Sequence, residues 1–116
     1  MTITRIDPGQ RFAAAVRHND TVYVAGQVAD TATGSVEVQT REVLAKIDAL
    51  LAEAGSSKAK LLSINVYLAN ISDFDAMNRA FDAWVDKANL PVRATIEARL
   101  ASPDLRVEMT AVAAAD

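Results

Sequence analysis

The clearest pattern in this chain is a strict alternation of polar and apolar residues over positions 93–101. Successive side chains of an extended strand point to opposite faces, so the alternation predicts a strand with one polar and one apolar face. The polar face would carry Arg93, Thr95, Glu97 and Arg99. The alternation returns at positions 105–111, where the polar face would carry Arg106, Glu108 and Thr110. Two neighbouring strands would thus offer guanidinium, carboxylate and hydroxyl groups together.

The remaining elements follow from the same kind of reading. Residues 2–6 predict an edge strand, and residues 12–17 and 21–28 predict a hairpin around the turn-prone residues 18–20. Apolar residues at helical spacing predict a helix over 36–54, which Gly55 would end, and a second helix over 73–88. Residues 61–69 alternate again and predict a strand.

The predicted order βββαβαββ indicates an α+β sandwich, in which one sheet is covered on one face by two helices. Two helices cover only one side, so polar side chains would lie on the other. We expect these to be Ser63, Asn65, Tyr67, Arg93, Thr95, Glu97, Arg99, Arg106, Glu108 and Thr110. Such a face could be a plain solvated surface, or it could close against copies of the same chain, with charged groups in the clefts between subunits.

Composition narrows the class of function. The 116 residues suit a single domain over 1–116, with 51% hydrophobic and 23% charged residues, as in ordinary globular chains. A net charge of −3 argues against a nucleic-acid partner. The sequence has no apolar run long enough for a membrane span and no secretory leader, so a cytoplasmic location is expected. Zero cysteines exclude disulfides and thiolate chemistry.

Metal and phosphate sites are not indicated. His18 is the only histidine and lies in a predicted turn, so no metal site is expected. The four glycines are dispersed and form no phosphate-binding loop.

Several segments point to a known family. They are Tyr23–Gln27, Ala54–Gly55, Asp73–Asn78, Pro91–Glu97 and Val107–Ala113. With their spacing, these segments resemble the RidA/YjgF family of reactive enamine and imine deaminases, and most closely its small YoaB-like, RutC-type members. The resemblance covers nearly the whole chain. It implies a chorismate-mutase-like fold, a homotrimer with sites between subunits, and hydrolysis of 2-imino acids to 2-oxo acids and ammonia without a cofactor.

The resemblance also implies two catalytic residues. Arg93 matches the arginine that holds the substrate carboxylate, and a guanidinium fork suits bidentate carboxylate binding. Glu108 matches the glutamate that orients the attacking water. On pattern alone, each could instead be a surface residue, with Glu108 as a cross-strand partner of an arginine.

Four further residues match substrate-contacting positions of the family. Gly26 would leave space against the ligand, although unusual backbone angles are the commoner reason for a glycine. Asn78 would border the pocket from the second helix, or serve as an ordinary helix-face amide. Thr95 and Phe12 depart from the cysteine and tyrosine of many members. Threonine keeps the backbone N–H and adds a hydroxyl, whereas phenylalanine keeps the ring without a polar tip.

Two other functions fit the same residues. The first is a non-catalytic trimeric module that binds a 2-oxo acid or an amino acid, which the missing hydroxyl at Phe12 favours. The second is another enzyme on the same fold, such as a chorismate mutase. A dicarboxylate substrate calls for two cations, and Arg93 alone provides one.

Overall fold

The computed structural model describes residues 2–31 and 34–116. Its elements follow the predicted order βββαβαββ, with two added 3₁₀ turns at Lys58–Lys60 and Ile71–Asp73. The strands are β1 (Ile3–Pro8), β2 (Ala13–His18), β3 (Thr21–Gln27), β4 (Leu61–Leu68), β5 (Val92–Glu97) and β6 (Val107–Ala114). The helices are α1 (Val36–Glu53) and α2 (Phe74–Trp84). Neither helix of this described chain is long and apolar enough to cross a membrane.

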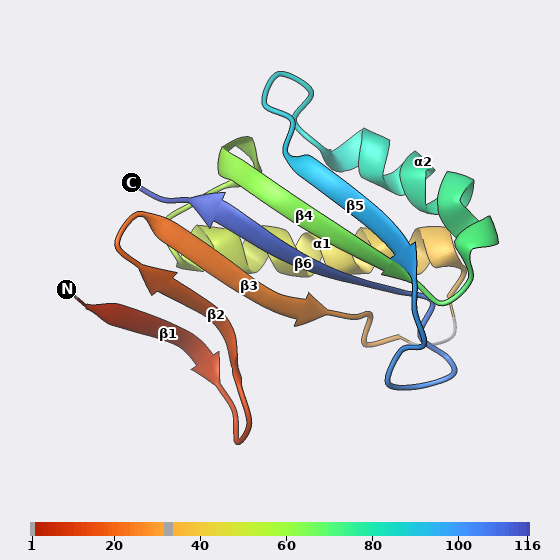
Figure 1. Cartoon of the computed structure of the whole chain (residues 1–116), viewed down its shortest axis with the longest axis horizontal. Helices are drawn as coiled ribbons and strands as arrows, with labels where there is room; N and C mark the ends of the chain where they lie inside the picture. Colours follow the sequence, from red (N-terminus) through yellow and green to blue (C-terminus); the bar gives the residue numbers. More distant parts are fainter. Residues whose placement is uncertain (1, 32–33) are drawn as a thin grey trace.

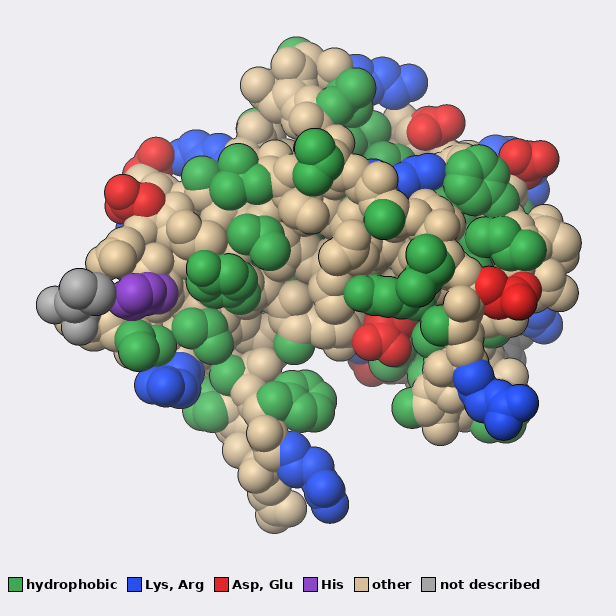
Figure 2. All heavy atoms as spheres, in the orientation of Figure 1, with side chains coloured by type: hydrophobic (Ala, Val, Ile, Leu, Met, Phe, Trp, Pro, Cys, Tyr) green, Lys and Arg blue, Asp and Glu red, His purple; other side chains and the backbone are tan. Residues whose placement is uncertain are grey.

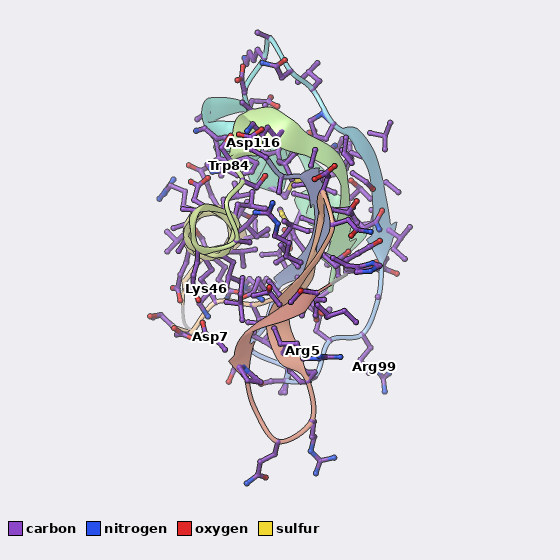
Figure 3. All side chains as sticks on the ribbon, turned by 90° about the vertical axis from the view of Figure 1, so that its left-hand side faces the viewer. Arg5, Asp7, Lys46, Trp84, Arg99 and Asp116 are labelled. Carbon is purple, nitrogen blue, oxygen red and sulfur yellow. The ribbon has the colours of Figure 1, made fainter. Side chains whose placement is uncertain are left out.

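All six strands form one sheet in the order β1-β2-β3-β6-β4-β5. Every described neighbouring pair is antiparallel except β4 and β5, which run parallel and are joined through α2. Both helices lie on one face of the sheet, and the β1–β2 hairpin and β5 form its opposite edges (Figure 1). The view at 90° shows α1 end-on beside the sheet (Figure 3). The predicted α+β sandwich with one covered face is therefore confirmed.

The core lies between α1 and the central strands. The predicted apolar stripe of α1 is buried, and it packs on the inward side chains of β3, β4 and β6. The fully or nearly fully buried members include Val22, Val43, Leu44, Ile47, Leu51, Ile64, Val66, Leu68, Met77, Val107 and Met109. The helix pattern of the sequence thus identified the core correctly, because only one stripe of α1 can reach the sheet.

The C-terminal end of α1 is closed by a glycine and an arginine. Gly55 has φ +85°, and the N–H groups of Gly55 and Ser56 donate to the carbonyls of Ala52 and Leu51, so the helix ends as predicted. Arg17, on β2, donates from Nη1 to the carbonyl of Ala54 at 2.9 Å and also bonds the carbonyl of Asp116. A cation at this end opposes the partial negative charge of the helix terminus, where the last turn has no basic residue of its own.

Replacing Arg17 by methionine should lower the free energy of unfolding by about 1–2 kcal/mol, because the carbonyl of Ala54 loses its charged donor. Urea denaturation with the fluorescence of Trp84 as probe measures this loss. Arg41→Met is the matched control, since Arg41 makes a solvent-exposed pair with Glu37 and should leave the midpoint unchanged. Equal midpoints for all three proteins would show that Arg17 does not secure the helix end.

The structure corrects the predicted faces of the sheet. The register places Arg93 beside Ile64 and Thr95 beside Val66, and both of these partners are fully buried under the helices. Arg93, Thr95 and Glu97 therefore lie on the helix-covered side, not on the open face. Alternation shows which side chains share a face, but it does not show which face receives the helices. The prediction was correct for β4 and β6, whose open-face pairs are Ser63–Val112, Asn65–Thr110 and Tyr67–Glu108.

The predicted strand over 93–101 was also too long, since β5 ends at Glu97. The connection that follows is fastened to α1 by Gln39, which is fully buried. The Gln39 side chain donates to the carbonyl of Asp104 at 3.0 Å and accepts from the N–H of Arg106 at 2.9 Å. Arg99 leaves the sheet in this connection and points away from α1 (Figure 3). The second helix is also shorter than predicted, because the backbone turns extended at Val85.

Candidate functional site

Arg93 lies at the edge strand β5 and is held by α2. Its Nη1 donates to the side-chain oxygen of Asn78 at 2.7 Å. The guanidinium carbon lies 4.7 Å from the ring centroid of Phe81 and 5.7 Å from that of Phe74, within the range of cation–π attraction. Three contacts from one helix thus fix the direction of the guanidinium before any ligand arrives.

The environment of Arg93 suits the binding of an anion. Partial burial lowers the pKa of Arg93 from its ordinary value, and the nearby charge of Asp82 acts in the opposite direction. An arginine keeps its charge under such a shift, so a half-buried cation remains. Among the hydrogen bonds of the described residues, Arg93 uses only Nη1. Its Nε and Nη2 donors are therefore available as a fork for a carboxylate.

The free edge of β5 places a backbone donor beside this fork. The N–H of Ala98 bonds the carbonyl of Leu68 on β4 at 2.9 Å. Neighbouring residues of a strand direct their N–H and C=O groups to opposite sides, so the odd-numbered residues of β5 direct theirs outward. The N–H of Thr95, which is two residues after Arg93, therefore points away from the sheet at its open edge.

The side-chain hydroxyl of Thr95 is also available for a hydrogen bond. Its Oγ1 is buried and has no hydrogen-bond partner among the residues that the structure describes. Buried polar atoms in native proteins almost always have a partner, which can be a water or a ligand. Thr95 therefore offers two hydrogen-bonding groups near Arg93, one at the open edge and one on the helix-covered side of the sheet.

Glu108 lies on the opposite face of the sheet from Arg93. It sits beside Tyr67 of β4 on the open face, and its side chain leans over Gly26 of β3. No ion pair or hydrogen bond of its carboxylate occurs within residues 2–31 and 34–116, so the alternative of a cross-strand arginine partner does not hold here. An unpaired carboxylate on a sheet face can orient a water molecule.

Phe12 is remote from both groups. It lies at the tip of the β1–β2 hairpin, where it is 69% exposed and lines a shallow hollow with Asp7, Gln10 and Arg11. Four strand spacings separate β2 from β5, which is about 19 Å at about 4.8 Å each. One chain therefore brings Arg93, Asn78 and Thr95 together and pairs Gly26 with Glu108, but it does not unite the two groups or add Phe12.

Two aromatic residues of this site were not predicted as functional. Both belong to the apolar positions from which the second helix was predicted. Phe81 is buried in the core and Phe74 is 39% exposed, and both rings lie close to Arg93. The signal was present in the sequence, because residues 74, 78 and 81 are spaced to share one helix face. The sequence did not show on which side of β5 Arg93 lies, and this was needed to assign the two aromatic residues to the site.

Two other features do not contribute to this site. A hollow past the end of β5 is lined by Glu97, Arg99 and Pro103, and none of the six predicted site residues lines it. Alanine, leucine and proline side chains form most of its wall, and these offer no group that could bind an anion. Over the described ranges, no three residues of the types His, Cys, Asp and Glu gather as a metal site would require.

This chain is similar to known proteins along nearly its whole length. Residues 2–115 match the family model described as Endoribonuclease L-PSP. A RutC family protein of Haemophilus ducreyi is 46% identical over 97% of this chain and 96% of its own length. The RutC family protein YoaB of Escherichia coli is 44% identical over 98% of this chain and 99% of its own. A crystal structure of a YjgF family member from Neisseria meningitidis superposes with a TM-score of 0.97 at 39% identity, covering 100% of this chain and 97% of that one.

Proposed function

The chain belongs to the RutC/YjgF family, and from this premise we propose that it hydrolyses short 2-imino acids to 2-oxo acids and ammonia. The proposed substrates are 2-iminopropanoate and 2-iminobutanoate. The observation that carries the proposal is the guanidinium of Arg93, which is half-buried and fixed by Asn78 and Phe81 while no described residue accepts a hydrogen bond from its Nε or Nη2. A planar fork held in this way matches a carboxylate.

The substrate would bind along the edge of β5. Arg93 takes the carboxylate through two parallel hydrogen bonds, and the outward N–H of Thr95 donates to the same end of the molecule. The imine carbon is then presented beyond the sheet edge. Because the N–H is part of a paired strand, its direction is set before binding, and little ordering remains to be done when the substrate arrives.

Glu108 would supply the water. It cannot reach a ligand on Arg93 of its own chain, since the two side chains lie on opposite faces of one sheet. We therefore assign them to two copies: one copy provides Arg93, Thr95 and Asn78, and the neighbour provides Glu108. Gly26, which lies under Glu108, and Phe12 at the hairpin tip would come from the neighbour as well. A head-to-tail ring of three copies gives three equal sites, the cyclic arrangement of a homotrimer.

The surface of the chain is suited to such an association. The sheet face that no helix covers carries apolar side chains among its polar ones (Figure 2). Tyr23 and Ile96 on this face are each 50% exposed, and Val92 is 70% exposed. Exposed aromatic and β-branched residues on an unpaired edge and an open face are typical of surfaces that are covered in an assembly.

The chemistry needs one proton carrier and no cofactor. The Glu108 carboxylate takes a proton from a water molecule as the oxygen bonds to the imine carbon, and it returns this proton to the nitrogen, which gives a tetrahedral adduct with one hydroxyl and one amino group. Glu108 then takes the hydroxyl proton as the carbonyl forms and passes it to the nitrogen, while the C–N bond breaks with its electron pair leaving on ammonia. Fixing the water and the imine in this geometry contributes through proximity, and the acid–base step adds about 10²–10⁴-fold.

An oxidase that releases 2-iminopropanoate from alanine provides the test. Purified protein added to this reaction should speed the appearance of pyruvate and ammonia above the spontaneous rate. A rate that stays at the spontaneous value over a range of protein concentrations would refute the deaminase proposal.

A second function is favoured by one observation: Arg93, Asn78 and Thr95 lie together within one chain, whereas Glu108 lies on the opposite face of the sheet. A binding module for 2-oxo acids or amino acids would need only that half. Calorimetric titration with 2-oxobutanoate distinguishes the two functions. Saturable binding together with an unchanged imine hydrolysis rate identifies the binding module.

Changing Asn78 to aspartate should raise KM for the imine about tenfold, because a carboxylate at this position neutralises Arg93 and competes with the substrate. Initial rates over a range of amino-acid oxidase concentrations give this KM. Asn89→Asp is the matched control, since it adds the same charge at an exposed position after α2. If the two variants have equal KM values, the residue at position 78 does not affect how Arg93 binds the substrate.

A further inference from the structure

Gly26 and Glu108 fit together on the open face of the sheet. A Cβ built on Gly26 would lie within the van der Waals envelope of Glu108 Oε2, 2.9 Å from its Cδ and 3.3 Å from its Cγ. The carboxylate of Glu108 thus occupies the space that any side chain at position 26 would need. The missing side chain leaves room for another residue of the same chain, which differs from the ligand space expected from the sequence.

Backbone conformation does not account for this glycine. Among the described glycines, only Gly55 has a positive φ. Any L-amino acid could therefore adopt the backbone angles of Gly26, but its Cβ would displace the Glu108 carboxylate. The usual reason for a glycine at a strand end does not apply here.

The backbone around Gly26 also directs it toward Glu108. The register of β3 against β6 shifts between Val24, which pairs with Ala111, and Gln27, which pairs with Met109. Three steps on β3 thus match two on β6, which is the pattern of a β-bulge. Bulges re-aim a strand locally, and this one brings the bare Cα of Gly26 under the Glu108 side chain.

We propose that Gly26 is a positioning residue whose missing side chain sets where the Glu108 carboxylate stands. This inference rests on the proposed function for its catalytic consequence, but the fit itself is a property of the chain. No described hydrogen bond or ion pair holds that carboxylate. Packing against β3 at Gly26 is then the constraint that keeps it from rotating toward solvent.

Gly26→Ala should lower kcat for imine hydrolysis about 100-fold, because a misplacement of about 1 Å at the reacting groups costs about that much. KM should stay within about threefold, because in the proposed shared site the substrate carboxylate binds to Arg93 of the neighbouring copy and not to Gly26 or Glu108. Gly34→Ala is the matched control. Its new Cβ meets Val38 Cγ1 at 2.9 Å, which is a milder contact away from every candidate residue, and kcat should stay within about twofold of wild type.

A double-mutant cycle separates positioning from a direct role. Glu108→Asp withdraws the carboxylate by one methylene, so the methyl of Gly26→Ala no longer meets it. On that background, Gly26→Ala should change kcat by less than about threefold, a strongly non-additive result. Additive losses, or a loss confined to KM, would mean that Gly26 acts on the ligand itself, and the inference would be overturned.

A structural measurement decides the question without activity. Crystal structures of wild type and Gly26→Ala should show the Glu108 carboxylate displaced from β3 by the new methyl; an unmoved carboxylate would overturn the inference. If Gly26→Ala does not fold, adding Glu108→Ala should restore folding, since the colliding side chain is gone. Continued failure of that double variant to fold would equally count against the fit. A wild-type protein without deaminase activity would refute the proposed function and leave these outcomes decisive for Gly26.

Discussion

Replacing Arg93 by alanine should reduce kcat/KM for 2-iminopropanoate about 1000-fold. The substrate carboxylate would lose a bidentate, charge-assisted contact in a partly desolvated place, and losses of about 2–5 kcal/mol are usual for such contacts. Arg93→Lys should fall between alanine and wild type, because lysine keeps the charge but has no planar fork and a different fit between Phe74 and Phe81. Steady-state rates with an imine-generating oxidase measure both effects.

Arg79→Ala is the matched control for this series. Arg79 also lies on α2, next to Asn78, but it is exposed and pairs with Glu37 on α1. Its removal should leave kcat/KM within about twofold, as for surface changes away from a site. If alanine at position 93 were equally harmless, the carboxylate would have to bind elsewhere.

Replacing Glu108 by glutamine should lower kcat about 100–1000-fold and leave KM nearly unchanged. Glutamine keeps the size of the side chain but cannot accept a proton from water, and general base catalysis contributes in this range. The affinity for a 2-oxo acid should also persist, because in the proposed site the carboxylate of that ligand binds to Arg93. Calorimetry on the variant checks this affinity, and rates with saturating imine give kcat.

The two halves of the site predict opposite kinetic signatures. Loss of Arg93 removes binding that the substrate and the transition state share, so KM rises most; loss of Glu108 removes a group used only in the reaction, so kcat falls most. Glu97→Gln is a control for the second change, since Glu97 ends β5 and accepts from the N–H of Ile71 instead. A Glu108→Gln enzyme with wild-type kcat would leave the water without an assigned base.

The sequence predicted the number, order and type of the helices and strands because most of them have an amphipathic period that matches their burial. The stripe of α1 and the alternation of β4 and β6 identify one shared core. The glycine after α1 was recognised for the same kind of reason: a helix that ends in the left-handed region needs Gly55.

The site was harder to predict because the alternation of polar and apolar residues shows which side chains share a face of a strand, but not which face the helices cover. The residues of β5 were correctly divided into two sets, but the polar set faces α2 and the apolar set faces outward. An edge strand can invert the usual rule, since Arg93 is satisfied by Asn78 and aromatic rings at the rim of the core rather than by water. Nothing local in the sequence distinguishes these two placements.

Tertiary distance accounts for the remaining difference. Phe12 and Arg93 were matched to one pocket by resemblance, yet the strand order sends them to opposite edges of the sheet. The sequence of a single chain does not show which groups a neighbouring copy would contribute. The opposite faces of Arg93 and Glu108 make that contribution a requirement of the proposed reaction.

The most direct test of this account is to combine two inactive variants. Arg93→Ala and Glu108→Gln carry different affinity tags, are co-expressed, and are purified through both tags, so that every assembly contains both chains. In a ring of three, one interface joins an intact Arg93 to an intact Glu108, so activity should return to about one third of the wild-type value. Mixed assemblies that remain as inactive as each parent would contradict a site shared between two copies.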